Sequence, residues 1–211
     1  MPALTLDLYQ DGKPVWQQYR LDLGNDVAGI PIDLPEGAIA PCIQDFAQRD
    51  ETALQPGMDV TVIGFPFEQG VDMPFPIWKR AMVASEPGYT VFGNTQTLLD
   101  TPGTPGMSGS PVYRLSPGLE LTGDQHAKFS AMERGEIGAL DALASLDVGS
   151  LGAGVVLNWI GVYAGSTGVP GMDRLSLGRM MLASIVDLVA MHGEPGENPF
   201  PPQQLGDKDA A

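Results

Sequence analysis

The sequence TPGTPGMSGSPVY, residues 101–113, decides how this chain is interpreted, because it joins a rigid loop to the start of a strand. Its three glycines and three prolines indicate a tight, preformed loop, and Val112 and Tyr113 favour a β-strand. A serine at the tip of a Gly-flanked turn holds its hydroxyl clear of the backbone, which nucleophilic acyl transfer requires. A serine that merely caps the turn would give the same short Gly-x-Ser-Gly pattern, and the short pattern alone favours that structural role.

The amino-acid composition predicts a β-rich globular protein. The 211 residues are 43% hydrophobic, which is enough for one large all-β domain or two small subdomains. The 27 glycines and 19 prolines are spread without a period, which indicates many short strands joined by turns rather than a helical bundle.

The charge balance narrows the possible partners. The chain has 11 basic and 26 acidic residues, and its net charge is −15. Nucleic acids and anionic membranes are therefore not expected as partners, because phosphate binding needs clustered Lys and Arg. No uninterrupted apolar run approaches the roughly 20 residues of a membrane span.

Cysteine and histidine are too few for a disulfide or a clustered metal site. Cys42 is the only cysteine, which excludes an internal disulfide and fits a reducing compartment. Two scattered histidines do not make a metal site, so we expect no metal and no cofactor. The first residues carry charge early and lack the apolar core of a signal peptide. These features predict a cytoplasmic protein.

Apolar patterning predicts most of the secondary structure. Alternating or continuous apolar segments predict strands at 4–9, 14–23, 60–66, 75–85, 90–99 and 154–163. Asp11-Gly12 predicts a hairpin turn between the first two strands. A broken helix is expected over 127–146, and apolar residues at 3–4 spacing predict an amphipathic helix over 175–192.

Several motifs resemble those of one family when they are taken in order. The loop GMSGSPV at 106–112 resembles the nucleophile loop of trypsin-like (chymotrypsin-fold) serine peptidases, most of all the compact, disulfide-free bacterial type. Asp26-Val27-Ala28 resembles the segment that carries the triad aspartate in this family. The run VTVIGFP at 60–66 is similar to the opening strand of the second barrel, and WIGVYAG at 159–165 is similar to the strand that lines the substrate cleft.

The resemblance implies an all-β fold, a trypsin-like double β-barrel with an incomplete first barrel and a C-terminal α-helix. It divides the chain into the last strands of the first barrel at 1–35, a connector at 36–55, a second barrel at 56–174 with an insertion at about 116–150, a helix at 175–192 and a disordered tail at 193–211.

The resemblance also implies the roles of individual residues in a serine endopeptidase, a hydrolase that acts on polypeptides through an acyl-enzyme. Ser108 would be the nucleophile, and Asp26 would orient the general base. The backbone amides of Gly106 and Ser108 would form the oxyanion hole. The strand edge at Ala164, Gly165 and Ser166 would bind substrate by pairing with an extended peptide.

The triad histidine has no counterpart where the family carries it, before the aspartate. None of the 25 residues before Asp26 is a histidine. His126 lies in the insertion, where a surface position is expected, and His192 ends the predicted helix. We favour the interpretation that an upstream segment with the histidine, or a partner chain, completes the first barrel. The alternative is a pseudo-enzyme, and in either case we expect this chain alone to be nearly inactive.

Specificity and the competing functions depend on the same loop. Met107 stands where digestive trypsins carry an aspartate, so zymogen activation of that type is not expected. Pro102 and Thr104 indicate at most a small or apolar pocket.

The first competing function is a peptide-binding pseudo-protease that uses the 159–165 edge. The second is an unrelated β-rich binding module in which the serine loop is only structural.

Overall fold

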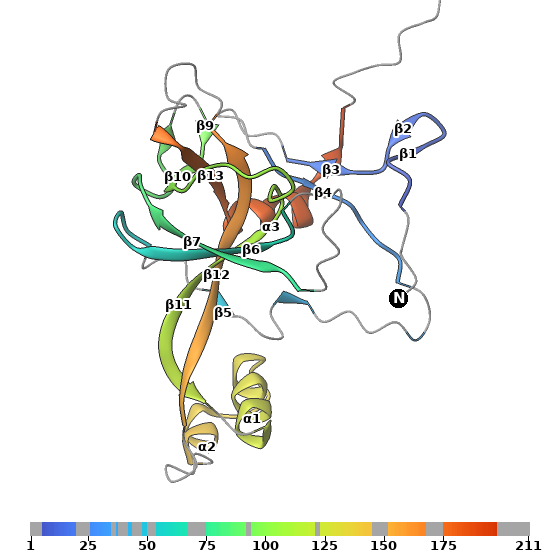
Figure 1. Ribbon diagram of the computed structural model, residues 1–211. Coiled ribbons are helices and arrows are strands. Elements are labelled where there is room, and N and C mark those ends of the chain that lie inside the picture. The colour runs from blue at the N-terminus through green and yellow to red at the C-terminus, as the bar shows by residue number, and fades with distance from the viewer. Residues whose placement is uncertain are drawn as a thin grey trace, which may run out of the picture.

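The structure is a computed structural model, and it describes residues 6–19, 26–34, 37, 42–43, 48–49, 54–66, 75–91, 94–120, 123–144, 152–167 and 175–197. Figure 1 shows a barrel with a long arm that points downward and with small strands to its right. The described part is mostly β-structure with few helices.

Six antiparallel strands close into a barrel. Its order is β11-β6-β7-β10-β13-β12, and β12 pairs with β11 to close the ring. Along the chain, the first four strands of the barrel are β6, β7, β10 and β11. In the sheet they lie in the order β11-β6-β7-β10, which is a Greek key. The six strands are β6 (Asp59–Gly64), β7 (Ile77–Val83), β10 (Thr97–Asp100), β11 (Pro111–Glu120), β12 (Gly152–Ser166) and β13 (Leu177–Leu182). The closed barrel is compatible with a chymotrypsin-like fold.

The barrel encloses one apolar core. Along β6, buried side chains alternate with more exposed ones, as the pattern VTVIG predicts for a half-buried strand. The core includes a residue of the serine loop, Met107, which is only 2% exposed. The buried members of this cluster are Leu54, Val60, Val62, Ala81, Val83, Leu99, Met107, Val112, Ile160, Tyr163 and Met180.

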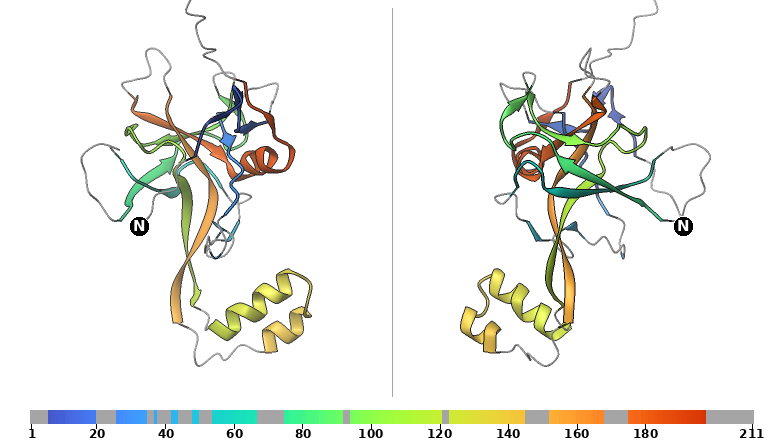
Figure 2. Two further views of the ribbon diagram at one scale, coloured as in Figure 1. Left: turned by 90° about the vertical axis from the view of Figure 1, so that its right-hand side faces the viewer. Right: turned by 60° about the vertical axis from the view of Figure 1, so that its left-hand side comes forward.

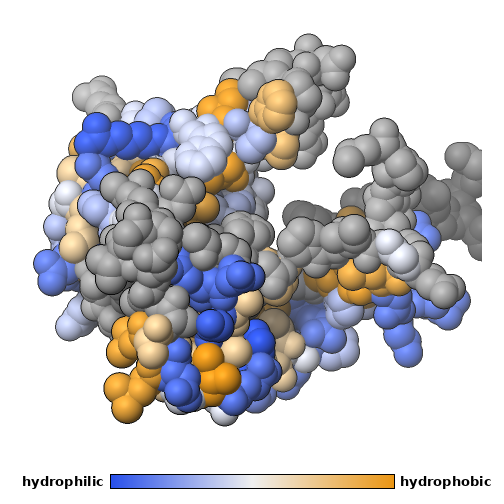
Figure 3. Space-filling model, turned by 90° about the horizontal axis from the view of Figure 1, so that it is seen from below, coloured by the Kyte–Doolittle hydropathy of each residue, from blue (hydrophilic) through white to orange (hydrophobic). Residues whose placement is uncertain are grey.

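Strands β11 and β12 continue beyond the barrel as a two-stranded ribbon that carries two helices at its end. The ribbon pairing runs to Glu120 and Gly152. The helices are α1 (Gly123–Glu133) and α2 (Ala139–Ala144), where the sequence predicts a broken helix. Both views in Figure 2 show this arm projecting from the barrel. Figure 3 shows apolar patches among polar ones in the view from below, and Leu140 and Leu143 of α2 are 81% and 53% exposed.

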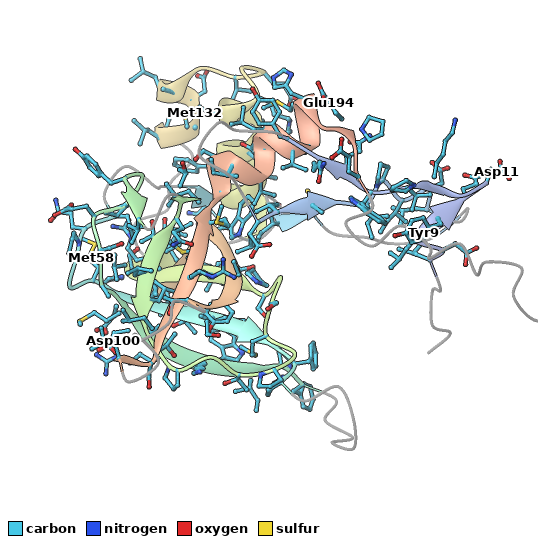
Figure 4. The ribbon with its side chains drawn as sticks, turned by 90° about the horizontal axis from the view of Figure 1, so that it is seen from above. Tyr9, Asp11, Met58, Asp100, Met132 and Glu194 are labelled. Atoms are coloured by element: carbon cyan, nitrogen blue, oxygen red, sulfur yellow. The ribbon has the colours of Figure 1, made fainter. Side chains whose placement is uncertain are left out.

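The first described residues form small sheets. Strands β1 (Tyr9–Gln10) and β2 (Lys13–Pro14) make a hairpin through Asp11 and Gly12, whose positive φ angles of 51° and 73° suit a tight hairpin turn. Figure 4 shows Tyr9 and Asp11 on this hairpin, far from Met58 and Asp100 on the barrel.

The remaining short strands also lie outside the ring of six. They are β3 (Gln17–Gln18), β4 (Ala28–Gly29) and β14 (Glu194–Pro195), which form one sheet, the pair β8 (Thr90–Val91) and β9 (Asn94–Thr95), and β5 (Gln48–Arg49), which pairs in parallel with β12. Among the described residues before Leu54, no second barrel closes.

Several sequence-based boundaries need correction, among them the strand predicted over 14–23, whose described part holds only β2 and β3. The helix predicted over 175–192 begins only at Ala183, as α3 (Ala183–His192), because Leu177–Leu182 pairs on both sides, with β10 and β12, and completes the barrel. The strand predicted over 90–99 is broken into β8, β9 and β10. In the predicted tail, Glu194 and Pro195 pair with β3, and residues 198–211 lie outside the described part.

None of the helices in the described ranges has the length and apolar character needed to cross a membrane.

Candidate functional site

Ser108 lies on the loop that connects β10 to β11. Two turns shape this loop, since the Met107 N–H donates to Thr104 O at 3.2 Å and the Ser110 N–H donates to Met107 O at 3.1 Å. Gly106 and Gly109 have φ angles of 87° and 84°, in the left-handed region that glycine adopts without strain. The loop therefore presents Ser108 at an exposed tip.

The residues on either side of Ser108 are buried and anchor the loop. Met107 inserts into the barrel core, and Ser110 is 8% exposed. Both pack over Gly64 at the end of β6, where a Cβ would overlap Ser110 Oγ and would lie 3.2 Å from Met107 Sδ. The loop is thus seated in a hollow that exists because residue 64 has no side chain.

Two backbone hydrogen bonds hold the serine loop against β12. The Gly109 N–H donates to Tyr163 O at 2.8 Å, and the Tyr163 N–H donates to Ser110 O at 2.8 Å. Ser108 consequently lies beside the segment 164–166. A Cβ on Gly165 would lie 3.3 Å from Ser108 Oγ, and the φ of Gly165 is 92°.

A pocket of about 530 Å³ opens beside Ser108. The serine loop contributes one part of the wall, and Gly165 and Ser166, which approach this loop closely, contribute another. Among the described residues, the lining is Pro102, Gly103, Thr104, Pro105, Ser108, Gly165, Ser166, Thr167, Ser176 and Leu177. The structure therefore brings the expected nucleophile and two of the three expected substrate-binding residues to one pocket.

The two amides expected to form an oxyanion hole make no backbone–backbone hydrogen bond within the described part of the chain. Among the described residues, neither the Gly106 N–H nor the Ser108 N–H donates to a backbone carbonyl. Both residues are exposed, and they flank Met107, whose side chain points into the core. Backbone amides without a carbonyl partner are the kind of donor that a developing oxyanion needs.

Asp26 pairs with Arg179 of β13. Its Oδ2 lies 2.9 Å from Arg179 Nη2. The same guanidinium donates to Ala164 O at 2.7 Å and to Ser166 O at 2.9 Å. Because Arg179 Nη2 also lies 4.0 Å from the Cβ position of Gly165, the structure places Asp26 next to the strand that borders Ser108.

No described histidine side chain lies at this site. His192 ends α3, and its ring is 6.4 Å from the ring of Tyr19, measured between centroids. His126 belongs to α1, and its side chain is outside the described part. In this structure the Asp26 carboxylate therefore pairs with Arg179 and not with a described histidine.

Sequence reasoning missed two cations at the site, Lys79 and Arg179. Lys79 Nζ donates to Pro102 O and, at 3.1 Å, to Thr104 Oγ1, and both residues line the pocket. Burial lowers the pKa of the Lys79 ammonium. On β7, residues 79, 81 and 83 share one face of the strand, and Ala81 and Val83 on this face are buried. The sequence therefore contained a signal for Lys79, because alternation places this lysine on the same face as core residues.

The site has no metal-ligand cluster in the described ranges, since no group of three or more His, Cys, Asp or Glu side chains gathers there.

Burial raises the pKa of the Tyr163 phenol, next to the 164–166 segment, and the positive charge of Arg179 opposes this effect.

Comparisons with protein-family models, with curated proteins and with solved structures found no match to this chain.

Proposed function

We propose that this chain carries the nucleophile half of a trypsin-like serine peptidase, in which the closed barrel is the second barrel of a double barrel. One observation supports the proposal: exposed Ser108 lines a pocket together with Gly165 and Ser166, and in the described part neither its own N–H nor that of Gly106 donates to a backbone carbonyl. An accessible serine hydroxyl, amide donors and a place for the peptide are among the groups that acyl transfer to a serine requires.

The proposed reaction uses groups from three segments. A substrate carbonyl carbon would be attacked by Ser108 Oγ, and its oxygen would become an oxyanion that accepts from the Gly106 and Ser108 N–H groups. The substrate would lie along 164–166 as an added strand. Arg179 already donates to Ala164 O and Ser166 O, but a carbonyl has two lone pairs, so each oxygen can accept a second hydrogen bond.

The general base is the part of the proposal that the described residues do not supply. Asp26 would orient a histidine, as the resemblance implies, but its carboxylate is paired with Arg179. We therefore place the base outside the described residues and expect the isolated chain to react slowly, because loss of one triad member removes most of the rate.

Chemical rescue tests the proposal. The chain is incubated with a fluorophosphonate probe, with and without added imidazole, and the modified residue is identified by peptide mass spectrometry. We expect slow modification of Ser108 that imidazole accelerates, and no adduct at position 108 in Ser108→Ala. A chain that never reacts at Ser108, even with imidazole, would rule out the peptidase proposal.

A second candidate function is peptide binding without catalysis. The observation in its favour is the Arg179–Asp26 pair, because a carboxylate that already has a cationic partner is not free to orient a base. Under this function Ser108→Ala would leave peptide affinity and biological activity unchanged, whereas a peptidase would lose its activity.

A further inference from the structure

We propose that the pocket beside Ser108 selects a substrate residue with a carboxylate side chain, glutamate or aspartate, and that Lys79 supplies the positive charge that selects it. This inference rests on the proposed function only in taking the pocket as the place where a peptide side chain binds.

The pocket lining favours a polar, anionic group. Besides Ser108, four lining residues carry hydroxyl groups, and among the described residues of the lining none is charged. Hydroxyl groups donate readily to carboxylates, and a carboxylate accepts several such bonds at once. A basic side chain would find no carboxylate in this wall. The four hydroxyl residues are Thr104, Ser166, Thr167 and Ser176.

Lys79 makes the serine-loop wall electropositive. Its ammonium is hydrogen-bonded to Pro102 O and Thr104 Oγ1, both of them parts of that wall. Among the described residues these are neutral partners, and burial is the cause that lowers the Lys79 pKa. A partly buried ammonium with only neutral partners attracts a carboxylate that enters the adjacent space.

The neighbouring cations differ from Lys79 in this respect. Arg80, the next residue on β7, is exposed and pairs with Asp59 at 2.6 Å. Arg179, on the other side of Ser108, pairs with Asp26 at 2.9 Å. Their charges are therefore already compensated by carboxylates, whereas the described partners of Lys79, Pro102 O and Thr104 Oγ1, are neutral groups of residues that line the pocket.

Thr104 connects Lys79 to the pocket. Its Oγ1 accepts a hydrogen bond from the ammonium, so its own O–H remains to donate to another group. Because Thr104 lines the pocket, a bound carboxylate would be the acceptor that completes this chain of hydrogen bonds. The selection is local, since the whole chain has a net charge of −15 and repels anions at long range.

A matched pair of peptides tests the inference. Ac-Ala-Ala-Pro-Glu-NH2 and Ac-Ala-Ala-Pro-Gln-NH2 have nearly the same shape and differ in one charge, and the C-terminal amide leaves the glutamate side chain as the only carboxylate. Affinities are measured by NMR titration of the full chain at pH 7 and low salt. We expect the Glu peptide to bind about tenfold more tightly than the Gln peptide, and Ac-Ala-Ala-Pro-Lys-NH2 to bind more weakly than either.

Three variants assign the preference to Lys79. Lys79→Met is expected to reduce the Glu/Gln ratio to within about twofold, whereas Lys79→Arg keeps most of it. Lys128→Met removes the same charge from exposed α1 and is expected to leave the ratio unchanged. Far-UV circular dichroism and thermal melting check that each variant is folded. If Lys79→Met does not fold, Lys79→Arg still provides a decisive test.

The outcomes separate this inference from the proposed function. Equal binding of the three peptides would overturn charge selection and leave the peptide site in place. A Glu preference that survives in folded Lys79→Met would also overturn it, because the charge would then come from elsewhere. If no peptide binds, the inference fails, while fluorophosphonate labelling of Ser108 reports on the peptidase proposal separately.

Discussion

Arg179 binds Asp26 and the strand beside Ser108 at the same time, since its Nη2 lies 2.9 Å from Asp26 Oδ2 and 2.7 Å from Ala164 O. The two partners differ in exposure: the Asp26 side chain is 61% exposed and the Arg179 side chain 22%. The bond from Arg179 to Ala164 O is part-buried, whereas its contacts with Asp26 and with Ser166 O are exposed, so water can replace Asp26 more easily than it can replace the donor to Ala164 O. The carbonyl bonds, that to Ala164 above all, are therefore expected to matter more for stability than the ion pair.

We predict that Arg179→Met destabilises the fold by about 2 kcal/mol, because it leaves the carbonyl oxygens of Ala164 and Ser166 without their donor. Asp26→Asn is expected to cost less than about 1 kcal/mol, as for an exposed ion pair. Urea unfolding monitored by tryptophan fluorescence measures both values. Equal losses in the two variants would show that the ion pair, and not the carbonyl contacts, stabilises this region.

Met107 is predicted to hold the serine loop through its burial. Met107→Ala should cost about 2–4 kcal/mol, because it opens a cavity in the barrel core, where the side chain is 2% exposed. Met191 of α3 is 68% exposed and provides the matched control, with an expected loss below about 0.5 kcal/mol. Urea unfolding of both variants checks this. A loss in Met107→Ala as small as that in Met191→Ala would mean that the loop is anchored by its hydrogen bonds alone.

The strands could be predicted from the sequence wherever local pattern and tertiary environment agree. Val60, Val62 and Gly64 alternate with more exposed residues, and the structure has β6 there. Asp11-Gly12 gives a hairpin because both residues adopt positive φ.

The segment 177–182 could not be assigned from local pattern. Leu177, Met181 and Leu182 lie at helical spacing, and Leu and Met favour helices. The barrel needed a strand between β10 and β12, and pairing on both sides outweighed this local preference. The helix therefore begins only at Ala183.

The site was partly predictable for a similar reason. The position of Ser108 on a Gly-flanked turn follows from local sequence, and so does the strand over 154–163, whereas its continuation to Ser166 was expected only from the resemblance. The partners of the cations do not, because Lys79 reaches Thr104 across 25 residues and Arg179 reaches Asp26 across 153 residues. Contacts at such separations depend on how the strands pair around the barrel.

Gly165 is predicted to be necessary for access to Ser108. In Gly165→Ala the new methyl group would lie 3.3 Å from Ser108 Oγ, and the φ of 92° disfavours any side chain, so we expect a loss of about 1–2 kcal/mol together with weaker peptide binding and slower labelling of Ser108. Thermal melting, NMR titration and the fluorophosphonate probe measure these effects.

Gly135 offers the control for backbone strain. Its φ is 74°, and a Cβ there would have nothing within 4 Å. Gly135→Ala, at the turn after α1, should carry a similar backbone cost and leave Ser108 labelling unchanged. If both variants label Ser108 at the wild-type rate, Gly165 does not control access to the serine.

The charge on Lys79 predicts a pH dependence with a definite sign. Burial lowers the Lys79 pKa below its ordinary value of 10.5, so the folded protein releases this proton at a lower pH than the unfolded chain does. Rising pH through the folded pKa therefore removes the cost of burying the charge, and wild type should gain stability relative to Lys79→Met in this alkaline window. Urea unfolding of both proteins across the window measures the difference.

The preference for the Glu peptide should change with pH in the opposite direction. It requires an ionised glutamate, whose pKa is about 4.3, and a protonated Lys79. We expect a plateau from about pH 6 upward that falls as pH rises through the Lys79 pKa, below 10.5. Lys79→Arg should extend the plateau, because a guanidinium stays charged throughout this range. NMR titrations of the two peptides at several pH values decide the matter, and a preference that falls at the same pH in wild type and Lys79→Arg would show that another group titrates.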